Sequence, residues 1–291
     1  MHGLAAYFRF RGLGIFRQPL VLELFEATRF SMITAAVATR QATFLASESW
    51  STDPWQIAGV KKNIVQSLID HAAEIPALYV EFVKYLKTAD PVLKAHMAAV
   101  LEINMANLFE KFQQWHHTWE MDNDLVIQEG ALSVEEQEYF GVSSKVAFVN
   151  IDHMFTEIHY LQSLIILLEL WKTFRAAALG LTTDAQDGQG CLSEETRTTR
   201  SHLLPSTTSL HMQGRAAALE ICRIILGCLQ PSGRLAYAVQ FILAIRMALI
   251  VFRQEEGNLQ VTWLEDCLQR SSEIKHGWDI GKNAMQSYQL A

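Results

Sequence analysis

The chain has 291 residues, of which half are hydrophobic and 19% are charged, and its formal net charge is −7 at pH 7. This composition excludes an intrinsically disordered chain, and the length suffices for a buried core. The acidic balance argues against direct DNA binding by this chain alone, because surfaces that neutralise phosphates carry a basic patch or stripe. The densest basic pair is Lys61-Lys62.

Hydrophobic residues recur at steps of three and four along most of the chain, which predicts helices. In chain order the predicted helices span 19–38, 54–86 (one or two helices, with a break or kink at Pro76), 91–119, 147–179, 213–229, 231–253 and 261–270. Asp90 and Pro91 are typical of a helix start. No alternating strand pattern stands out. The predicted fold class is all-α, a multi-helix domain with antiparallel helix pairs around one core.

Two of these helices are apolar enough to need separate discussion. The 147–179 segment is hydrophobic nearly all round, which predicts a central, buried helix. The 235–252 segment approaches the length of a membrane span, but it contains Gln240 and Arg246. A mid-helix arginine costs about 2.5–3.5 kcal/mol on insertion scales. We therefore expect a core helix there and no membrane interaction.

Two polar segments interrupt the helical pattern. Residues 120–146 are acidic, and residues 181–209 are rich in Ser, Thr, Gly and Gln. Both are expected to be flexible loops. We expect them to interrupt a single helical domain over residues 1–291 rather than to separate two domains.

The four cysteines, Cys191, Cys222, Cys228 and Cys267, include no close CxxC pair. They fit no zinc-site template and do not suggest a disulfide scaffold. We therefore expect reduced cysteines in an intracellular protein, with no metal and no cofactor.

Short motifs at both ends of the chain resemble, in order, the fungal-specific transcription factor domain, the regulatory region that follows a six-cysteine zinc cluster. The residues that carry the resemblance are Arg11, Gly12, Arg29, Arg40, Trp50, Pro54 and Trp55 near the N-terminus, and Gly277, Trp278, Asp279 and Gly281 near the C-terminus. Each motif alone is weak, and their order makes the match moderately specific.

The resemblance implies a nuclear, helical regulatory region, with a cytoplasmic location as the alternative. In that family the region modulates a separate DNA-binding domain through ligands or partner proteins, and many members regulate secondary-metabolite gene clusters. The six-cysteine cluster is not in this sequence, so no DNA-contacting residue can be carried over. A protein partner or a second copy of the chain is the expected binding partner.

Histidines on two predicted helices are the candidates for chemistry. His153, Glu157 and His159 fall on one helix, where His153 and Glu157 share a face and His159 points away. This is not the two-histidine spacing of a zinc protease. His116 and His117 lie near a helix C-terminus, where a histidine interacts favourably with the helix dipole. The alternative without chemistry is that the first group forms a polar seam on a buried helix and that His116 and His117 only interact with the helix dipole.

The seven tryptophans predict large core contacts or, alternatively, an apolar pocket for a small hydrophobic ligand. Such a pocket would also suit an enzyme, and a cyclase or isomerase acting on a hydrophobic biosynthetic intermediate is the alternative function. We expect a regulator rather than an enzyme.

Overall fold

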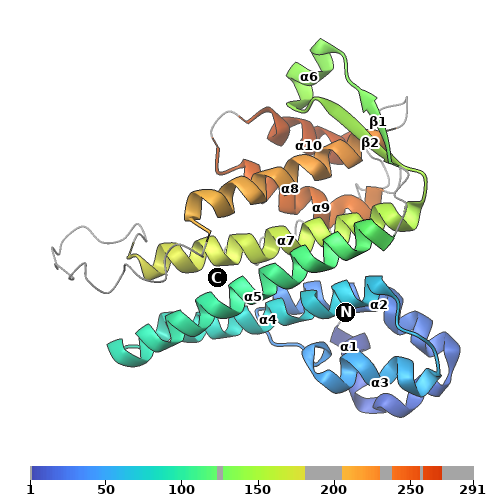
Figure 1. Ribbon diagram of the computed structural model, residues 1–291, viewed down its shortest axis with the longest axis vertical. Helices are drawn as coiled ribbons and strands as arrows, with labels where there is room; N and C mark the ends of the chain where they lie inside the picture. Colours follow the sequence, from blue (N-terminus) through green and yellow to red (C-terminus); the bar gives the residue numbers. More distant parts are fainter. Residues whose placement is uncertain (1, 123–126, 181–204, 230–237, 256–257, 271–291) are drawn as a thin grey trace.

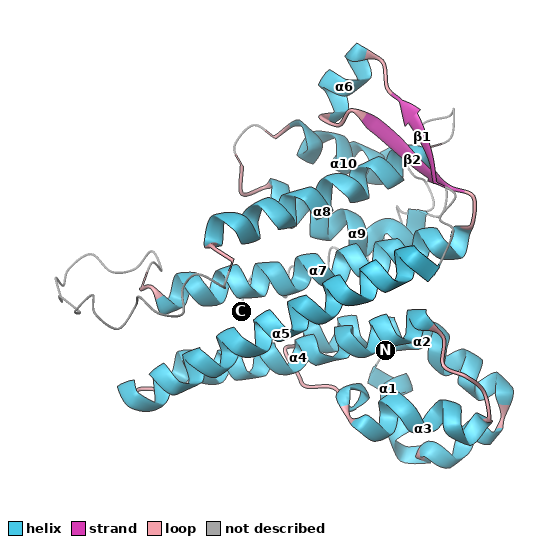
Figure 2. Cartoon of the chain, viewed as in Figure 1, coloured by secondary structure: helices cyan, strands magenta, loops and turns pink. Residues whose placement is uncertain are grey.

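The computed structural model describes residues 2–122, 127–180, 205–229, 238–255 and 258–270. These residues form ten α-helices, two short 3-10 helices and one two-stranded sheet, so the predicted all-α class is confirmed (Figures 1 and 2). The elements are α1 (His2–Arg11), η1 (Leu13–Arg17), α2 (Pro19–Ala38), η2 (Phe44–Ala46), α3 (Glu48–Ala58), α4 (Ile64–Lys87), α5 (Pro91–Asp122), β1 (Ile127–Ala131), α6 (Val134–Phe140), β2 (Ser144–Phe148), α7 (Ile151–Ala178), α8 (Thr207–Gly227), α9 (Ala238–Phe252) and α10 (Leu259–Arg270).

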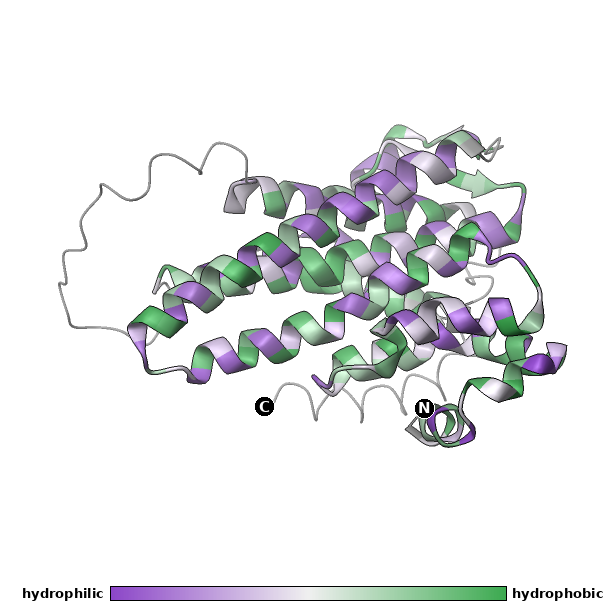
Figure 3. Ribbon diagram, turned by 60° about the horizontal axis from the view of Figure 1, so that its bottom comes forward, coloured by the Kyte–Doolittle hydropathy of each residue, from purple (hydrophilic) through white to green (hydrophobic). Residues whose placement is uncertain are grey.

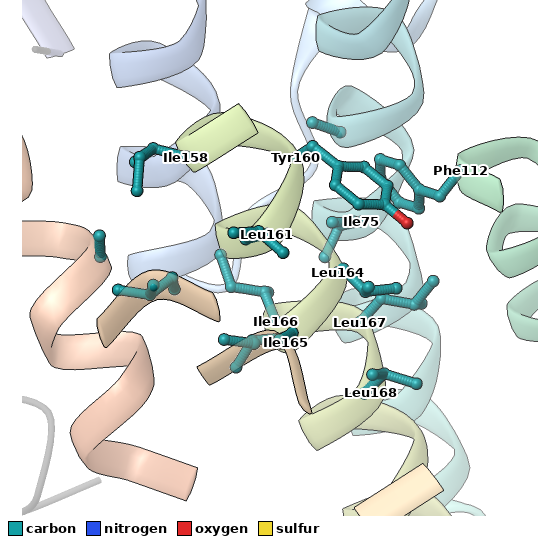
Figure 4. Close-up of a cluster of buried hydrophobic side chains, with 14 of the residues drawn as sticks. Ile75, Phe112, Ile158, Tyr160, Leu161, Leu164, Ile165, Ile166, Leu167 and Leu168 are labelled. Atoms are coloured by element: carbon teal, nitrogen blue, oxygen red, sulfur yellow. The ribbon is translucent and has the colours of Figure 1, made fainter. Parts of the chain in front are cut away.

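Helix α7 lies at the centre of the molecule, as its composition predicts. It packs against α4 and α5 on one side and against α8 and α9 on the other (Figure 1). Leu164 to Leu168 are all buried, and their side chains point to both sides of the helix (Figure 4). A helix that is hydrophobic all round must be covered all round, and here two helical layers cover it.

The N-terminal part of the chain forms the outer layer below α4 and α5 in Figure 1. There α2 packs on α4, and α1, η1 and α3 close over the end of α2. Aromatic rings fill the space between them: the Phe16 ring centroid lies 4.8 Å from that of Phe25, and Trp50 contacts both. Offset and edge-on ring pairs of this kind stabilise a core beyond the area they bury.

Helix boundaries follow local signals. Pro19 and Pro91 each occupy the first position of their helix, where proline loses no hydrogen bond. Asp90 caps α5 through Oδ1, which accepts a hydrogen bond from the Val92 amide at 2.9 Å. The predicted 54–86 segment divides at Gly59, which has a φ of 69°, whereas Pro76 lies inside a continuous α4. Of the break or kink expected at Pro76, the break is therefore wrong.

The segment 120–146 is not the loop that its acidic composition predicts. It contains the end of α5, then β1, α6 and the start of β2, with Ile127 paired to Phe148 and Ala131 to Ser144 in an antiparallel register. Helix α6 begins with a capping box in which the Ser133 side chain accepts from the Glu136 amide. The sequence signal is weak because β1 is almost fully exposed and therefore lacks apolar alternation.

The second predicted loop, 181–209, lies mostly outside the described residues, and its last three residues belong to α8. Helix α8 connects the two-stranded sheet to the core. A Cβ on Gly227 of α8 would stand 1.9 Å from the Val146 carbonyl oxygen of β2, so only glycine permits this approach.

Most helices carry both hydrophobic and hydrophilic residues (Figure 3). Within the described ranges, no helix is both long and apolar enough to cross a membrane. Helix α9, part of the 235–252 segment, instead buries Phe241, Ile245 and Phe252 in the core, as expected.

Candidate functional site

The structure brings two of the predicted candidates into contact, His116 from α5 and Glu157 from α7. His116 Nε2 lies 3.0 and 3.2 Å from the two carboxylate oxygens of Glu157. On the other side of the ring, Nδ1 lies 3.6 Å from a carboxylate oxygen of Glu120, one turn further along α5. The His116 and Glu157 side chains are 22% and 11% exposed. Both ring nitrogens therefore face carboxylates at the edge of the core.

This arrangement favours a charged imidazole. Burial lowers the pKa of His116, but the hydrogen bond to Glu157 and the charges of Glu157 and Glu120 outweigh burial, so the pKa is raised above its ordinary value. A histidine held in this way is protonated over a wider pH range than a free one.

Aromatic rings surround the pair. The His116 ring stacks on Tyr160 with centroids 4.1 Å apart, and Tyr160 in turn stacks on Trp115. The Tyr160 hydroxyl accepts a hydrogen bond from Gln113 at 3.2 Å. Burial, together with the charge of Glu157, raises the pKa of Tyr160. Its phenol therefore stays neutral and serves as a flat packing surface for the imidazole.

The other predicted histidines do not join this pair. His153 contacts Trp119 edge-on with centroids 5.9 Å apart. His159 lies against the Phe30 ring, and burial lowers its pKa to about 4, so it is neutral at physiological pH. His117 is exposed. Within the described structure, His116 and Glu157 are the only two of the five candidates that form a direct polar contact with each other.

The sequence gives no local signal for the contact, because 41 residues separate His116 from Glu157. Tyr160, Glu120 and Gln113 were not identified as candidates. Tyr160 lies one turn beyond Glu157 on α7, and Gln113 and Glu120 lie one turn before and after His116 on α5. Helical spacing around the two candidates is the signal that could have found them.

A second polar cluster lies in the N-terminal layer around Arg29, which is fully buried. Its Nη2 donates to Asp70 Oδ1 at 2.6 Å, and its Nη1 donates to Gln66 Oε1 at 3.0 Å. Lys62 also pairs with Asp70 and donates to the Ser51 carbonyl at 2.6 Å. Two cations and one carboxylate thus connect α2, α3 and α4.

Trp55 forms the wall of this cluster. The Arg29 guanidinium lies 5.0 Å and the Lys62 ammonium 4.5 Å from centroids of its ring system, and its indole N–H donates to Glu26 at 2.6 Å. Burial lowers the pKa of Arg29 and of Lys62, although Asp70 opposes the shift in both. Stacking on the indole and pairing with Asp70 offset part of the cost of burying these two cations.

The remaining resemblance residues near the N-terminus have backbone or packing roles. Gly12 and Arg40 adopt positive φ values of 67° and 52° at the ends of α1 and α2. Trp50 packs on Phe44 with centroids 4.6 Å apart, and Pro54 is buried inside α3. Arg11 is the exposed last residue of α1. The resemblance residues near the C-terminus lie outside the described residues: Gly277, Trp278, Asp279 and Gly281.

Cavities elsewhere among the described residues include the following three. One of about 170 Å³ is lined by α1 and α2 and includes Arg9 and Phe44. A second of about 350 Å³ and a third of about 170 Å³ lie between α4 and α5 and share Asn104. None of these three is lined by His116 or Glu157. In the part of the chain that the structure describes, no group of three or more His, Cys, Asp or Glu side chains could hold a metal ion.

Comparisons with known proteins add no relative. No protein-family model matches the chain, and neither a curated protein nor a solved structure is detectably similar to it. The resemblance to the fungal regulatory domain therefore stays a prediction carried by the motif residues.

Proposed function

We propose that this chain is the regulatory part of a transcription regulator. It acts in the nucleus, binds a protein partner or a small hydrophobic ligand, and thereby shifts the activity of a DNA-bound factor. A bound molecule can do this only through different affinities for two states of the regulator.

The observation that carries the proposal is the contact of Arg29 with Trp55. These two residues carry the resemblance and are 26 positions apart in the sequence, yet they share one buried cluster. Trp50, a third such residue, packs on Phe25 beside them. The contact supports the proposal because the motif residues of one domain have to lie within one structural unit. Residues that together support one helical layer are what a shared domain architecture requires.

The enzyme alternative is favoured by one observation, the His116–Glu157 pair with its raised histidine pKa. Acid–base catalysis also needs a substrate within hydrogen-bond reach of such a pair. The two side chains hydrogen-bond each other, and none of the three hollows reaches them. We therefore place a cyclase or isomerase activity second.

A tethering experiment tests the proposal. Residues 1–291 are fused to an unrelated DNA-binding domain at a reporter promoter, and the DNA-binding domain alone serves as the baseline. We expect the fusion to change reporter output several-fold. The Arg29→Met variant should lose this effect because it disrupts the buried cluster, and Arg11→Met, at an exposed position, should keep it. An output equal to the baseline for the unaltered fusion would overturn the proposal.

A further inference from the structure

The first half of α5 turns a second hydrophobic face to solvent. Leu101, Met105 and Leu108 face the core, whereas Leu93, Val100 and Ile103 on the outer side are 49%, 41% and 48% exposed. Val92 is 79% exposed on the same side. A surface helix normally keeps its outer face polar. Exposed hydrophobic side chains gathered on one face of a helix indicate a surface that another molecule covers.

The spacing of these outer residues is that of a coiled-coil seam. Five residues follow one another along α5 at steps of three, four, three and four, and therefore form a single stripe: Leu93, His96, Val100, Ile103 and Asn107. Leu93, Val100 and Asn107 occupy one heptad position, and His96 and Ile103 occupy the other. A polar residue in such a seam fixes the register of the partner helix. The occupant is therefore a helix that lies along α5.

The surface beside the stripe is hollowed. The smaller hollow between α4 and α5 is lined by His96, Met97 and Val100, and the larger one by Asn104, Asn107 and Leu108. Seam residues of one helix insert between residues of the other in such a contact. The α4–α5 pair ends at the lower left of Figure 1. It presents both protruding side chains and the spaces that receive them.

We infer that the chain forms a two-fold symmetric dimer in which α5 packs antiparallel against α5 of a second copy. The axis passes between Val100 and Ile103, so Val100 packs on Ile103 of the partner subunit. The same symmetry places His96 opposite Asn107 of the partner subunit. An imidazole and an amide can hydrogen-bond each other, so both polar seam residues gain a partner at once.

Charge is complementary in this arrangement. The tip of the α4–α5 pair carries the exposed Lys87, whereas Lys84 already pairs with Glu81 at 2.7 Å, and exposed Glu110 lies further along α5. Antiparallel packing about the proposed axis brings the tip of each copy beside Glu110 of the partner subunit. A parallel arrangement would instead place the two lysine-bearing tips side by side. The charges therefore favour a second copy in the antiparallel direction.

The available area also suits a dimer. The exposed stretch of α5 covers about 20 residues, or about 30 Å, and two helices packed side by side are about 20 Å wide. The resulting footprint of about 600 Å² per copy counts both helices, so α4 of each copy has to join the α5–α5 contact for the interface to approach the roughly 800 Å² per partner of a standard one. The inference is independent of the proposed regulatory function, since it depends only on the α4–α5 surface.

The first test is the molar mass of the full chain by analytical ultracentrifugation over a range of micromolar concentrations. We expect a monomer–dimer equilibrium for the unaltered chain. The double variant Val100→Glu/Ile103→Glu should raise the dimer dissociation constant by at least about tenfold. The control Leu20→Glu/Leu24→Glu changes two exposed leucines on α2 and should dimerise as before. A chain that is monomeric at every concentration, or a Val100/Ile103 variant that still dimerises, overturns the inference.

A cross-linking test fixes the register and does not depend on the glutamate variants folding. Val100→Cys and Ile103→Cys proteins are mixed and oxidised, and the linked peptides are identified by mass spectrometry. The antiparallel dimer predicts a disulfide between position 100 of one copy and position 103 of the other. Links between identical positions, or no link beyond that of the unaltered chain, would contradict this packing.

Discussion

The imidazole of His116 on α5 lies between the carboxylates of Glu157 on α7 and Glu120 on its own helix, with Nε2 3.0 Å from Glu157. The contact joins two of the longest helices at the point where α7 enters the core. The stability of this junction therefore depends on the protonation of the His116 imidazole.

Replacing Glu157 by glutamine should lower the pKa of His116, because the main group that raises it is removed. NMR titration of the imidazole measures this directly. Glu120→Gln is the matched control and should lower the pKa less, since its carboxylate is exposed and 3.6 Å away. A His116 pKa unchanged in Glu157→Gln would contradict the described contact.

The same variant should lose stability in a pH-dependent way. A histidine whose pKa is raised by folding stabilises the folded state fully below its unfolded pKa, and the contribution disappears as the pH rises through the folded pKa. Glu157→Gln should therefore cost about 1–3 kcal/mol at pH 5 and less at pH 9. Urea unfolding at the two pH values measures the difference, and a loss that grows toward alkaline pH would count against it.

The buried cation in the N-terminal layer should contribute substantially to the free energy of unfolding. Arg29→Met removes the main partner of Asp70 and leaves only Lys62 beside it, so we expect a loss of about 3 kcal/mol in the free energy of unfolding. Arg11→Met, the same change at an exposed position, should alter stability by less than about 0.5 kcal/mol. Equal effects of the two substitutions in chemical denaturation would disprove the role assigned to Arg29.

Two glycines of α8 should respond in opposite directions to alanine. Gly227→Ala places a methyl group against the Val146 carbonyl oxygen and should destabilise the protein by about 2 kcal/mol or more. At Gly214 the nearest atom to a new methyl group is 3.8 Å away, so alanine should add about 0.5–1 kcal/mol through its higher helix propensity. Thermal melts of both variants check this, and a tolerated Gly227→Ala would show that β2 does not pack closely on α8.

Thiol reactivity should follow burial. Burial raises the pKa of the Cys222 thiol, which is fully enclosed, and raises that of the half-buried Cys228 to about 11. Both should react slowly with iodoacetamide at pH 7, and Cys222 should be the slower of the two because it is also inaccessible. Peptide mapping of the labelled protein measures the two rates, and faster labelling of Cys222 would contradict the packing of α8.

Much of the fold follows from the sequence because its long helices carry clear signals. Pro19 fixes the start of α2, and Asp90 with Pro91 fixes the start of α5. The two-stranded sheet was missed because β1 is short and exposed, so burial imposes no apolar alternation on it. The sequence predicts a break or kink at Pro76, and α4 continues through this residue without a break.

The candidate site was only half predictable. His116 and Glu157 could be named as titratable groups on helices, but their contact depends on how α5 packs against α7. Sequence spacing constrains neighbours within one helix and does not constrain partners 41 residues apart. The ion pair of the buried Arg29 could not be predicted for the same reason, since its partner Asp70 lies on another helix.

The most direct test of the regulatory proposal is to purify the native protein from the cells that express it and to determine its intact mass and associated proteins. The proposal predicts a six-cysteine zinc cluster, either on the same polypeptide or on a partner present in equal amounts, and binding of that assembly to DNA. A native protein with neither a linked nor an associated zinc-cluster DNA-binding domain would contradict it.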